Sequence, residues 1–203
     1  MKCFYIIYIV LFGAVHVAEG DSVPQQPSEF DKIIVSNFPP RSRKNVPANG
    51  WLQDGKFNCR LFLKLLTSHD PDLQVGALFT LGTVNLEKIS NSEDWAQIRD
   101  TMWSCLKAEN KEVRCTALSL GVRPFANGKD ADKFAGVLFD ALREKDDEIV
   151  LAALDGVPYF GRYVLASEEA IGTLRGLAFD PKRLKVRDTA TRYLISLIEV
   201  RRK

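Results

Sequence analysis

Few residues in this sequence have the side chains that nucleophilic or metal chemistry needs. Beyond the first twenty residues it has three cysteines and one histidine, which are Cys59, Cys105, Cys115 and His69. A cysteine nucleophile needs a base beside it, and His69 precedes Cys115 by 46 positions. Zinc ligands of the Cys/His type come in close pairs such as C-x2-C, and the sequence has none. We therefore expect no catalytic dyad, no metal site and no cofactor.

One cluster of acids, formed by Asp146, Asp147 and Glu148, has the composition of a general acid–base or calcium site. The same composition is typical of a helix start, where carboxylates cap free N–H groups and compensate the helix dipole. We prefer the second interpretation because it needs nothing beyond a helix. The sequence also lacks G-x-S-x-G, G-x-x-x-x-G-K-[ST] and G-x-G-x-x-G motifs. We therefore expect a protein that is not an enzyme.

Opposite charges nearly balance over the whole sequence. Its 203 residues include 28 Lys and Arg against 26 Asp and Glu, which gives a net charge of +2. Sequence-independent binding to nucleic acid depends on a strongly basic surface that neutralises phosphates. We therefore expect no nucleic acid among its partners.

The first twenty residues have the layout of a secretory signal peptide. Lys2 provides a positive charge, residues 3–18 are almost all apolar, and Ala18 and Gly20 provide the small residues of a cleavage site. An uncleaved membrane anchor is the alternative, but the apolar run is shorter than the roughly twenty residues that a spanning helix needs. We expect cleavage after Gly20, no second long apolar stretch, and no stable membrane insertion afterwards. The protein is then secreted or periplasmic, and soluble.

Residues 21–56 form a proline-rich segment. Five prolines interrupt it, and because proline fixes φ and removes a hydrogen-bond donor, no long helix can pass through. We expect an irregular, extended arm with a basic group at Arg41, Arg43 and Lys44. Residues 30–38 are apolar enough either to form a strand or to lie against the main body, and a loose linker is the remaining alternative.

Residues 57–203 repeat a helical pattern about four times. A Leu, Val or Ile residue, here called the anchor, is followed four positions later by alanine, and successive anchors are 40, 36 and 37 residues apart. The four pairs are Leu73 with Ala77, Val113 with Ala117, Ile149 with Ala153, and Val186 with Ala190. Residues four positions apart share one face of a helix, and the small alanine lets a second helix approach closely. An apolar run of helical period precedes each pair, so each unit is predicted to be two helices joined by a short turn.

The repeat resembles the HEAT-repeat family in several motifs. The residues that carry the resemblance are Asp70-Pro71, the pairs Val113-Arg114 and Val186-Arg187, and the run ALSLG from Ala117 to Gly121. The resemblance covers roughly residues 58–202. It implies an all-α fold, a right-handed α-α superhelix of about four HEAT-like helical hairpins, preceded by the arm. It implies little about function, because this architecture mostly serves as a binding surface for unrelated roles.

Two places depart from the repeat pattern. The fourth turn, residues 182–185, is basic where the turn is normally acidic. Pro158 lies inside the predicted second helix of the third unit, so that helix should break or end there.

Two arginines follow their anchors directly, namely Arg114 and Arg187. They are either ligand contacts or structural residues that reach acids in the adjacent turn. We expect the structural role, with Arg114 reaching Asp146 or Asp147.

The second helix of each predicted hairpin should offer a binding surface. Positions two, six and ten after each anchor point away from the face that carries the anchor and its alanine. Among them we select six candidate protein-binding residues, which are Phe79, Arg123, Asp155, Tyr159, Asp188 and Arg192. Tyr159 and Arg192 are the strongest, because aromatic and guanidinium groups dominate the energetics of protein interfaces. Two alternatives stay open: Phe79 packs on the neighbouring repeat, and Asp155 pairs with Arg192.

These observations favour a protein-binding module, a scaffold or adaptor that acts through the concave face of a helical solenoid. Its partner is another protein. A periplasmic immunity or inhibitor protein that neutralises an exported toxin or enzyme is the alternative, because small exported proteins without catalytic residues suit either role. An inhibitor forms a tight one-to-one complex, whereas an adaptor binds more weakly and through more than one patch.

Overall fold

The computed structural model describes residues 27–53, 56–85 and 92–201, with side chains to Leu197. The expected signal peptide, residues 1–20, and the first part of the expected arm lie outside the described residues.

The described part of the chain is all-α apart from one short strand pair. The helices are α1 (Glu29–Ser36), α2 (Cys59–Leu66), α3 (Pro71–Thr83), α4 (Ser92–Cys105), α5 (Lys111–Thr116), α6 (Ala131–Ala141), α7 (Asp147–Gly156), α8 (Gly161–Ala166), α9 (Glu168–Ala178) and α10 (Leu184–Arg201). Strands β1 (Leu52–Gln53) and β2 (Lys56–Phe57) pair antiparallel, with Leu52 opposite Phe57. The all-α fold predicted from the repeat is therefore confirmed.

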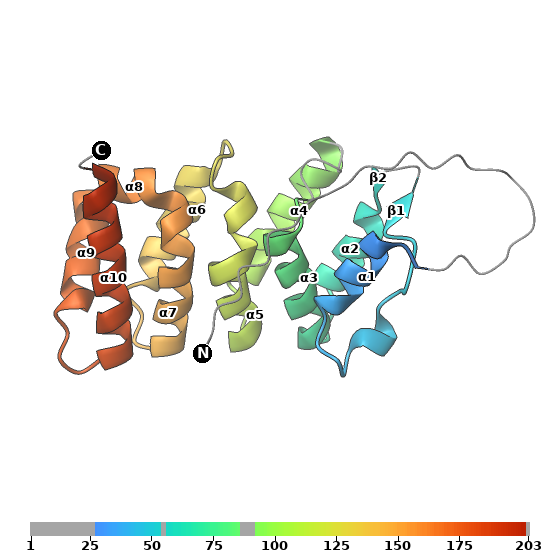
Figure 1. Ribbon diagram of the computed structural model, residues 1–203, viewed down its shortest axis with the longest axis horizontal. Coiled ribbons are helices and arrows are strands. Elements are labelled where there is room, and N and C mark those ends of the chain that lie inside the picture. The colour runs from blue at the N-terminus through green and yellow to red at the C-terminus, as the bar shows by residue number, and fades with distance from the viewer. Residues whose placement is uncertain (1–26, 54–55, 86–91, 202–203) are drawn as a thin grey trace, which may run out of the picture.

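The helices stand side by side in one elongated row (Figure 1). Along this row α3 packs against α5, α5 against α7, and α7 against α10. Three of these four helices also pack against the helix that precedes them in sequence, in the pairs α2 with α3, α6 with α7, and α9 with α10. We call α3, α5, α7 and α10 the second helices.

The anchors and their alanines form the buried seam of the second helices. The four anchors are at most 9% exposed and the four alanines 0%. Close approach along the seam also depends on Gly156 at the end of α7, because a Cβ there would overlap the carbonyl oxygen of Leu118. The sequence spacing therefore identified the core face of each second helix correctly.

Side-chain caps begin three of the second helices. The capping oxygen accepts a backbone N–H two or three residues on, at 3.0 Å for Asp70, 3.1 Å for Asn110 and 2.9 Å for Asp146. The N–H of Glu148 and the positive charge of Lys111 lower the pKa of Asp146. The acidic cluster at this turn is thus used for capping and for ion pairs, one of which joins Glu148 to Lys111 at 2.6 Å.

The described part of the proline-rich segment, residues 27–53 and 56, is folded, which corrects the expectation of an irregular, extended arm. Residues 30–38 are neither strand nor loose linker, because most of them belong to α1, and the alternative that they lie against the main body is confirmed by the burial of Ile34 and Phe38. Ser28 and Asp31 form a capping box at its start. The prolines do not interfere, since they lie before and after the helix and not within it.

The folded arm covers one end of the row. Phe38 follows α1 and packs so tightly on Gly76 of α3 that any Cβ at Gly76 would overlap its ring. From Phe38 an aromatic chain continues into α2, with centroid distances of 6.4, 6.4 and 5.4 Å, through Trp51, Phe57 and Phe62. Of the basic group in the arm, Arg41 is paired with Asp72 on α3. The arm is therefore part of the core rather than a free extension.

The expected break at Pro158 is confirmed. Helix α7 ends at Gly156, a 3-10 turn covers Val157–Phe160, and α8 starts at Gly161. A comparable break in the second unit was not predicted: α5 passes into a π-helical segment, Ala117–Gly121, and a 3-10 turn, Arg123–Phe125.

One helical stretch within the described residues passes the length and hydropathy test for a membrane span. It is Asp147–Ala166, which has 20 residues and contains an 18-residue window with a mean hydropathy of 1.3; the sequence interpretation did not anticipate it. Half of this stretch is buried inside the protein, where α7 packs on α5, α6 and α10. This position in the core accounts for its apolar composition.

Candidate functional site

Five polar or aromatic side chains from three successive second helices and the turns that end them lie next to one another. They are Arg123, Asp155, Tyr159, Arg192 and Tyr193, and we call them the Tyr159 cluster. Four of the five were predicted from the repeat register, and Tyr193 was not.

The first contact of the Tyr159 cluster joins the second and third units. The guanidinium carbon of Arg123 lies 4.7 Å from the centre of the Tyr159 ring, in a cation–π arrangement. Arg123 is held there by its Nε, which donates to the Ser119 carbonyl at 3.1 Å. Tyr159 remains 44% exposed, because the break at Pro158 turns the chain and presents its ring at the surface.

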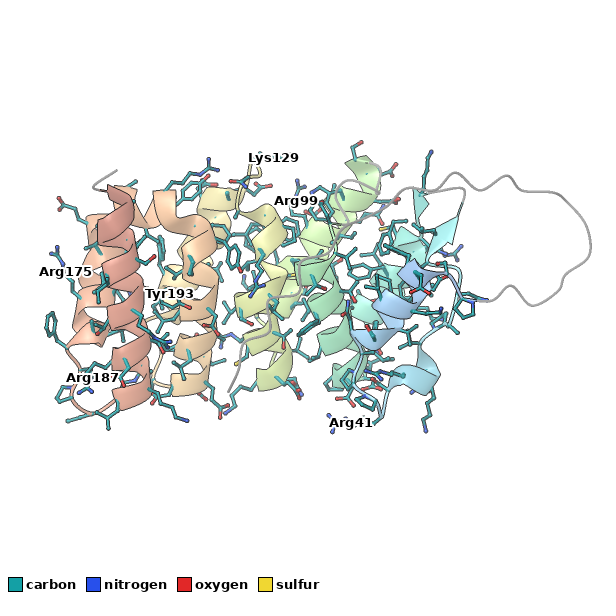
Figure 2. All side chains as sticks on the ribbon, viewed as in Figure 1. Arg41, Arg99, Lys129, Arg175, Arg187 and Tyr193 are labelled. Carbon is teal, nitrogen blue, oxygen red and sulfur yellow. The ribbon has the colours of Figure 1, made fainter. Side chains whose placement is uncertain are left out.

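The second contact joins the third and fourth units. The Tyr193 hydroxyl donates to the Asp155 carboxylate at 3.0 Å, and Figure 2 shows Tyr193 reaching from α10 toward α7. Burial, and then the negative charge of Asp155, raise the pKa of Tyr193. The hydroxyl therefore stays protonated and can donate throughout the neutral range.

Arg192 completes the Tyr159 cluster as its exposed cation. It lies close enough to Tyr193 for its charge to act on the pKa of that hydroxyl, which it lowers. Its Nη2 donates to the Thr189 hydroxyl at 3.2 Å on the same helix. The alternative in which Arg192 pairs with Asp155 is wrong, because Asp155 accepts from Tyr193 instead.

The other two predicted residues stand apart from the Tyr159 cluster. Phe79 on α3 is 41% exposed, so it is not buried on a neighbouring unit, and no hydrogen bond, ion pair or ring contact of its side chain is found among the described residues. Asp188 accepts from Arg187 beside it, at 3.0 and 3.1 Å. The structure thus brings four of the six candidates together and leaves Phe79 and Asp188 outside.

Tyr193 was missed because the repeat register places it on the core side of α10. It comes seven residues after Val186, a spacing that returns to the anchor face of a helix. A tyrosine at such a position is a usable signal, since its ring can pack on the core while its hydroxyl seeks a partner at the edge.

The cysteine thiols are poor nucleophiles. Burial raises the pKa of Cys59 to about 12 and that of Cys105 to about 11, and burial with nearby acids also raises the pKa of Cys115. Only the thiolate reacts, so all three groups are protonated and inert near neutral pH. In the part of the chain that the structure describes, no group of three or more His, Cys, Asp and Glu side chains could hold a metal ion.

The groups present in the Tyr159 cluster are suited to hydrogen bonding, ion pairing and ring contacts. The Tyr159 cluster offers guanidinium donors, two tyrosine rings and one carboxylate that is already oriented by a hydrogen bond.

No protein-family model matches this chain, and no curated protein matches it.

Proposed function

We propose that this is an exported helical-repeat protein, HEAT-like in architecture, that binds another protein through the Tyr159 cluster. The observation that carries the proposal is that tyrosine and arginine side chains from three successive units lie close together, with Tyr159 and Arg192 exposed and Arg123 half-buried. These two residue types are the most enriched among the residues that dominate protein interfaces.

Two features support the repeat architecture, a right-handed superhelix of about four hairpins. The anchor and alanine pairs are buried in all four units, and the second helices contact one another in sequence order. In such an array each unit covers the apolar face of the next, which is how helical repeats build one core.

The charges of the Tyr159 cluster support a protein partner over nucleic acid. It contains two cations and one anion, and Arg123 is already engaged with the Tyr159 ring. A surface that binds phosphates needs several free cations in succession. Mixed charge beside aromatic rings is instead typical of protein interfaces.

Export is the second element of the proposal, and it rests on residues 1–20 of the sequence. Intact mass spectrometry of the protein recovered from its native host tests it. We expect a chain that begins at Asp21, and a mass that retains residues 1–20 would contradict cleavage.

The binding proposal is tested with the wild-type protein as bait in an extract of the native host. The retrieved partner is then titrated against wild type, Tyr159→Ala and Arg192→Ala by calorimetry. Each substitution should weaken binding by about 2 kcal/mol or more, because both side chains are exposed and belong to the types that dominate protein interfaces. Arg175→Ala, on the exposed side of α9, is the matched control and should bind like the wild type.

Undiminished binding by both Tyr159→Ala and Arg192→Ala would refute the assignment of the site. The same titration separates the two roles considered from sequence. A tight one-to-one complex indicates an inhibitor, and weaker binding with further sites on the protein indicates an adaptor.

A further inference from the structure

The turn between α9 and α10 differs in chemistry from the other turns that lead into second helices. Those three turns end in a polar or acidic cap, provided by Asp70, Asn110 and Asp146. Together with Phe179, Asp180 and Pro181 before it, the fourth turn spans residues 179–185 and includes the first two residues of α10. It carries two apolar and two free basic side chains, which are Phe179, Leu184, Lys182 and Lys185. It projects at one corner of the molecule (Figure 1).

The apolar side chains of the fourth turn are unusually exposed. Phe179 is 81% exposed, the highest value of any large apolar side chain in the described residues, and Leu184 is 57% exposed. Groups this exposed contribute little to folding, because burial is what makes an apolar side chain stabilising. Two such side chains within five residues of each other indicate a contact outside the molecule.

The basic side chains of the fourth turn are available to a partner. Lys182 and Lys185 are exposed, and neither forms an ion pair within the described residues. Residues 179–188 include four basic and two acidic side chains. Arg187 lies at the same edge of the molecule (Figure 2) but pairs with Asp188, so the free positive charge of this turn comes from Lys182 and Lys185.

Three hydrogen bonds hold the fourth turn to its own backbone and to the preceding unit. The Asp180 carboxylate accepts the backbone N–H of Lys182 at 2.8 Å. Arg183 points inward and donates to the Asp147 carboxylate at 2.5 Å and to the Glu144 carbonyl at 3.2 Å. Because the backbone is fixed, little ordering cost remains when the exposed side chains bind a surface.

We propose that the fourth turn docks this protein on an anionic lipid surface. Phe179 and Leu184 enter the interfacial layer, while Lys182 and Lys185 contact the lipid phosphates. A protein partner is disfavoured because a stable protein interface buries about 800 Å² on each side, which one projecting turn does not offer. A bilayer accepts single side chains. The fourth turn lies on different residues from the Tyr159 cluster, so each site can fail without the other.

The test is cosedimentation of the exported protein with vesicles. One set contains phosphatidylcholine only, and the other contains phosphatidylcholine and phosphatidylglycerol in a two-to-one ratio. The variants are Lys182→Glu with Lys185→Glu, and Phe179→Ser with Leu184→Ser. The matched control is Lys107→Glu with Lys145→Glu, which makes the same charge change at exposed lysines in two other turns. All variants have the same N-terminus as the wild type, so differences in vesicle binding are due to the substitutions.

The wild type should bind the anionic vesicles and not the neutral ones. Each lysine beside an anionic surface is worth about fivefold in partitioning, so the Lys182 and Lys185 variant should lose about 25-fold or more. The Phe179 and Leu184 variant should lose about tenfold, because insertion of the apolar pair is removed. The control should keep most of the binding.

Three results would overturn the proposal. One is a wild type that does not bind anionic vesicles, and another is an equal loss in the control, which would indicate diffuse attraction to net charge. The third is binding to soluble polyglutamate that depends on the two lysines and not on Phe179, which would indicate an acidic protein instead. Circular dichroism of each variant verifies that these exposed substitutions leave the fold unchanged.

Discussion

At the scale of single residues, Arg114 shows what the sequence predicts and what it misses. It was expected to reach an acid in the next turn, and it does, but the acid is Glu144 rather than Asp146 or Asp147. Its Nε also donates to the Leu106 carbonyl at 3.2 Å. Asp146 caps α7, and Asp147 pairs with Arg183 at 2.5 Å. The repeat spacing does not predict that these two acids are already engaged with other groups.

Arg114→Ala should destabilise the protein by about 1 kcal/mol, because a partly screened ion pair and one hydrogen bond to a carbonyl are lost. For a chain of this size the melting temperature should fall by about 2–4 °C. Calorimetry measures the shift, and Lys107→Ala, at an exposed lysine in the turn before α5, is the control. An unchanged melting temperature combined with weaker partner binding would contradict the structural role.

At the scale of elements, α1 is where the sequence interpretation failed. The proline count suggested an extended arm, yet Ser28 and Asp31 have the spacing of a capping box and could have indicated a helix start. No local sequence pattern identifies the residues against which this part of the chain packs. The contact between Phe38 and Gly76 joins residues 38 positions apart, and only the folded chain brings them together.

Phe38→Ala should cost about 3–5 kcal/mol of stability, because its ring is 1% exposed and packs on Trp51 and Gly76. Denaturant unfolding measures the loss, and hydrogen exchange across Glu29–Ser36 should show that α1 loses protection. Phe179→Ala is the control, since that ring is 81% exposed and its removal should leave stability nearly unchanged. Full protection of α1 in Phe38→Ala would contradict the packing described.

The helix caps predict how stability depends on acid. The pKa of Asp146 is lowered mainly by the N–H of Glu148, and that of Asp72 by its hydrogen bond to Arg41. A lowered folded-state pKa means that the stabilisation is complete at about pH 5, one unit above the unfolded value, and is lost as pH falls through that value toward the folded one. The melting temperature should therefore drop between pH 5 and about pH 3. Asp146→Asn should reduce this fall in melting temperature. Asp132→Asn changes an exposed acid and should leave the fall as in the wild type. Equal falls in melting temperature in all three proteins would contradict the account.

At the scale of the whole molecule, the periodic spacing predicted the buried helix faces well and the contacts of the candidate site poorly. Recurrence of an anchor and an alanine every 36 to 40 residues was enough to place the buried faces of α3, α7 and α10. The Tyr159 cluster depends on breaks in that regularity. The 3-10 turns at Arg123–Phe125 and Val157–Phe160 set the positions of Arg123 and Tyr159, and an ideal repeat does not contain them.

The central claim is that another protein sits on the Tyr159 cluster, and photo-crosslinking in the native host tests it most directly. A benzoylphenylalanine is introduced in place of Tyr159, and in a second strain in place of Arg175 on the exposed side of α9. The account predicts one discrete crosslinked product from position 159 that disappears when Arg192→Ala is added, and none from position 175. A product from position 175 with none from position 159 would contradict it.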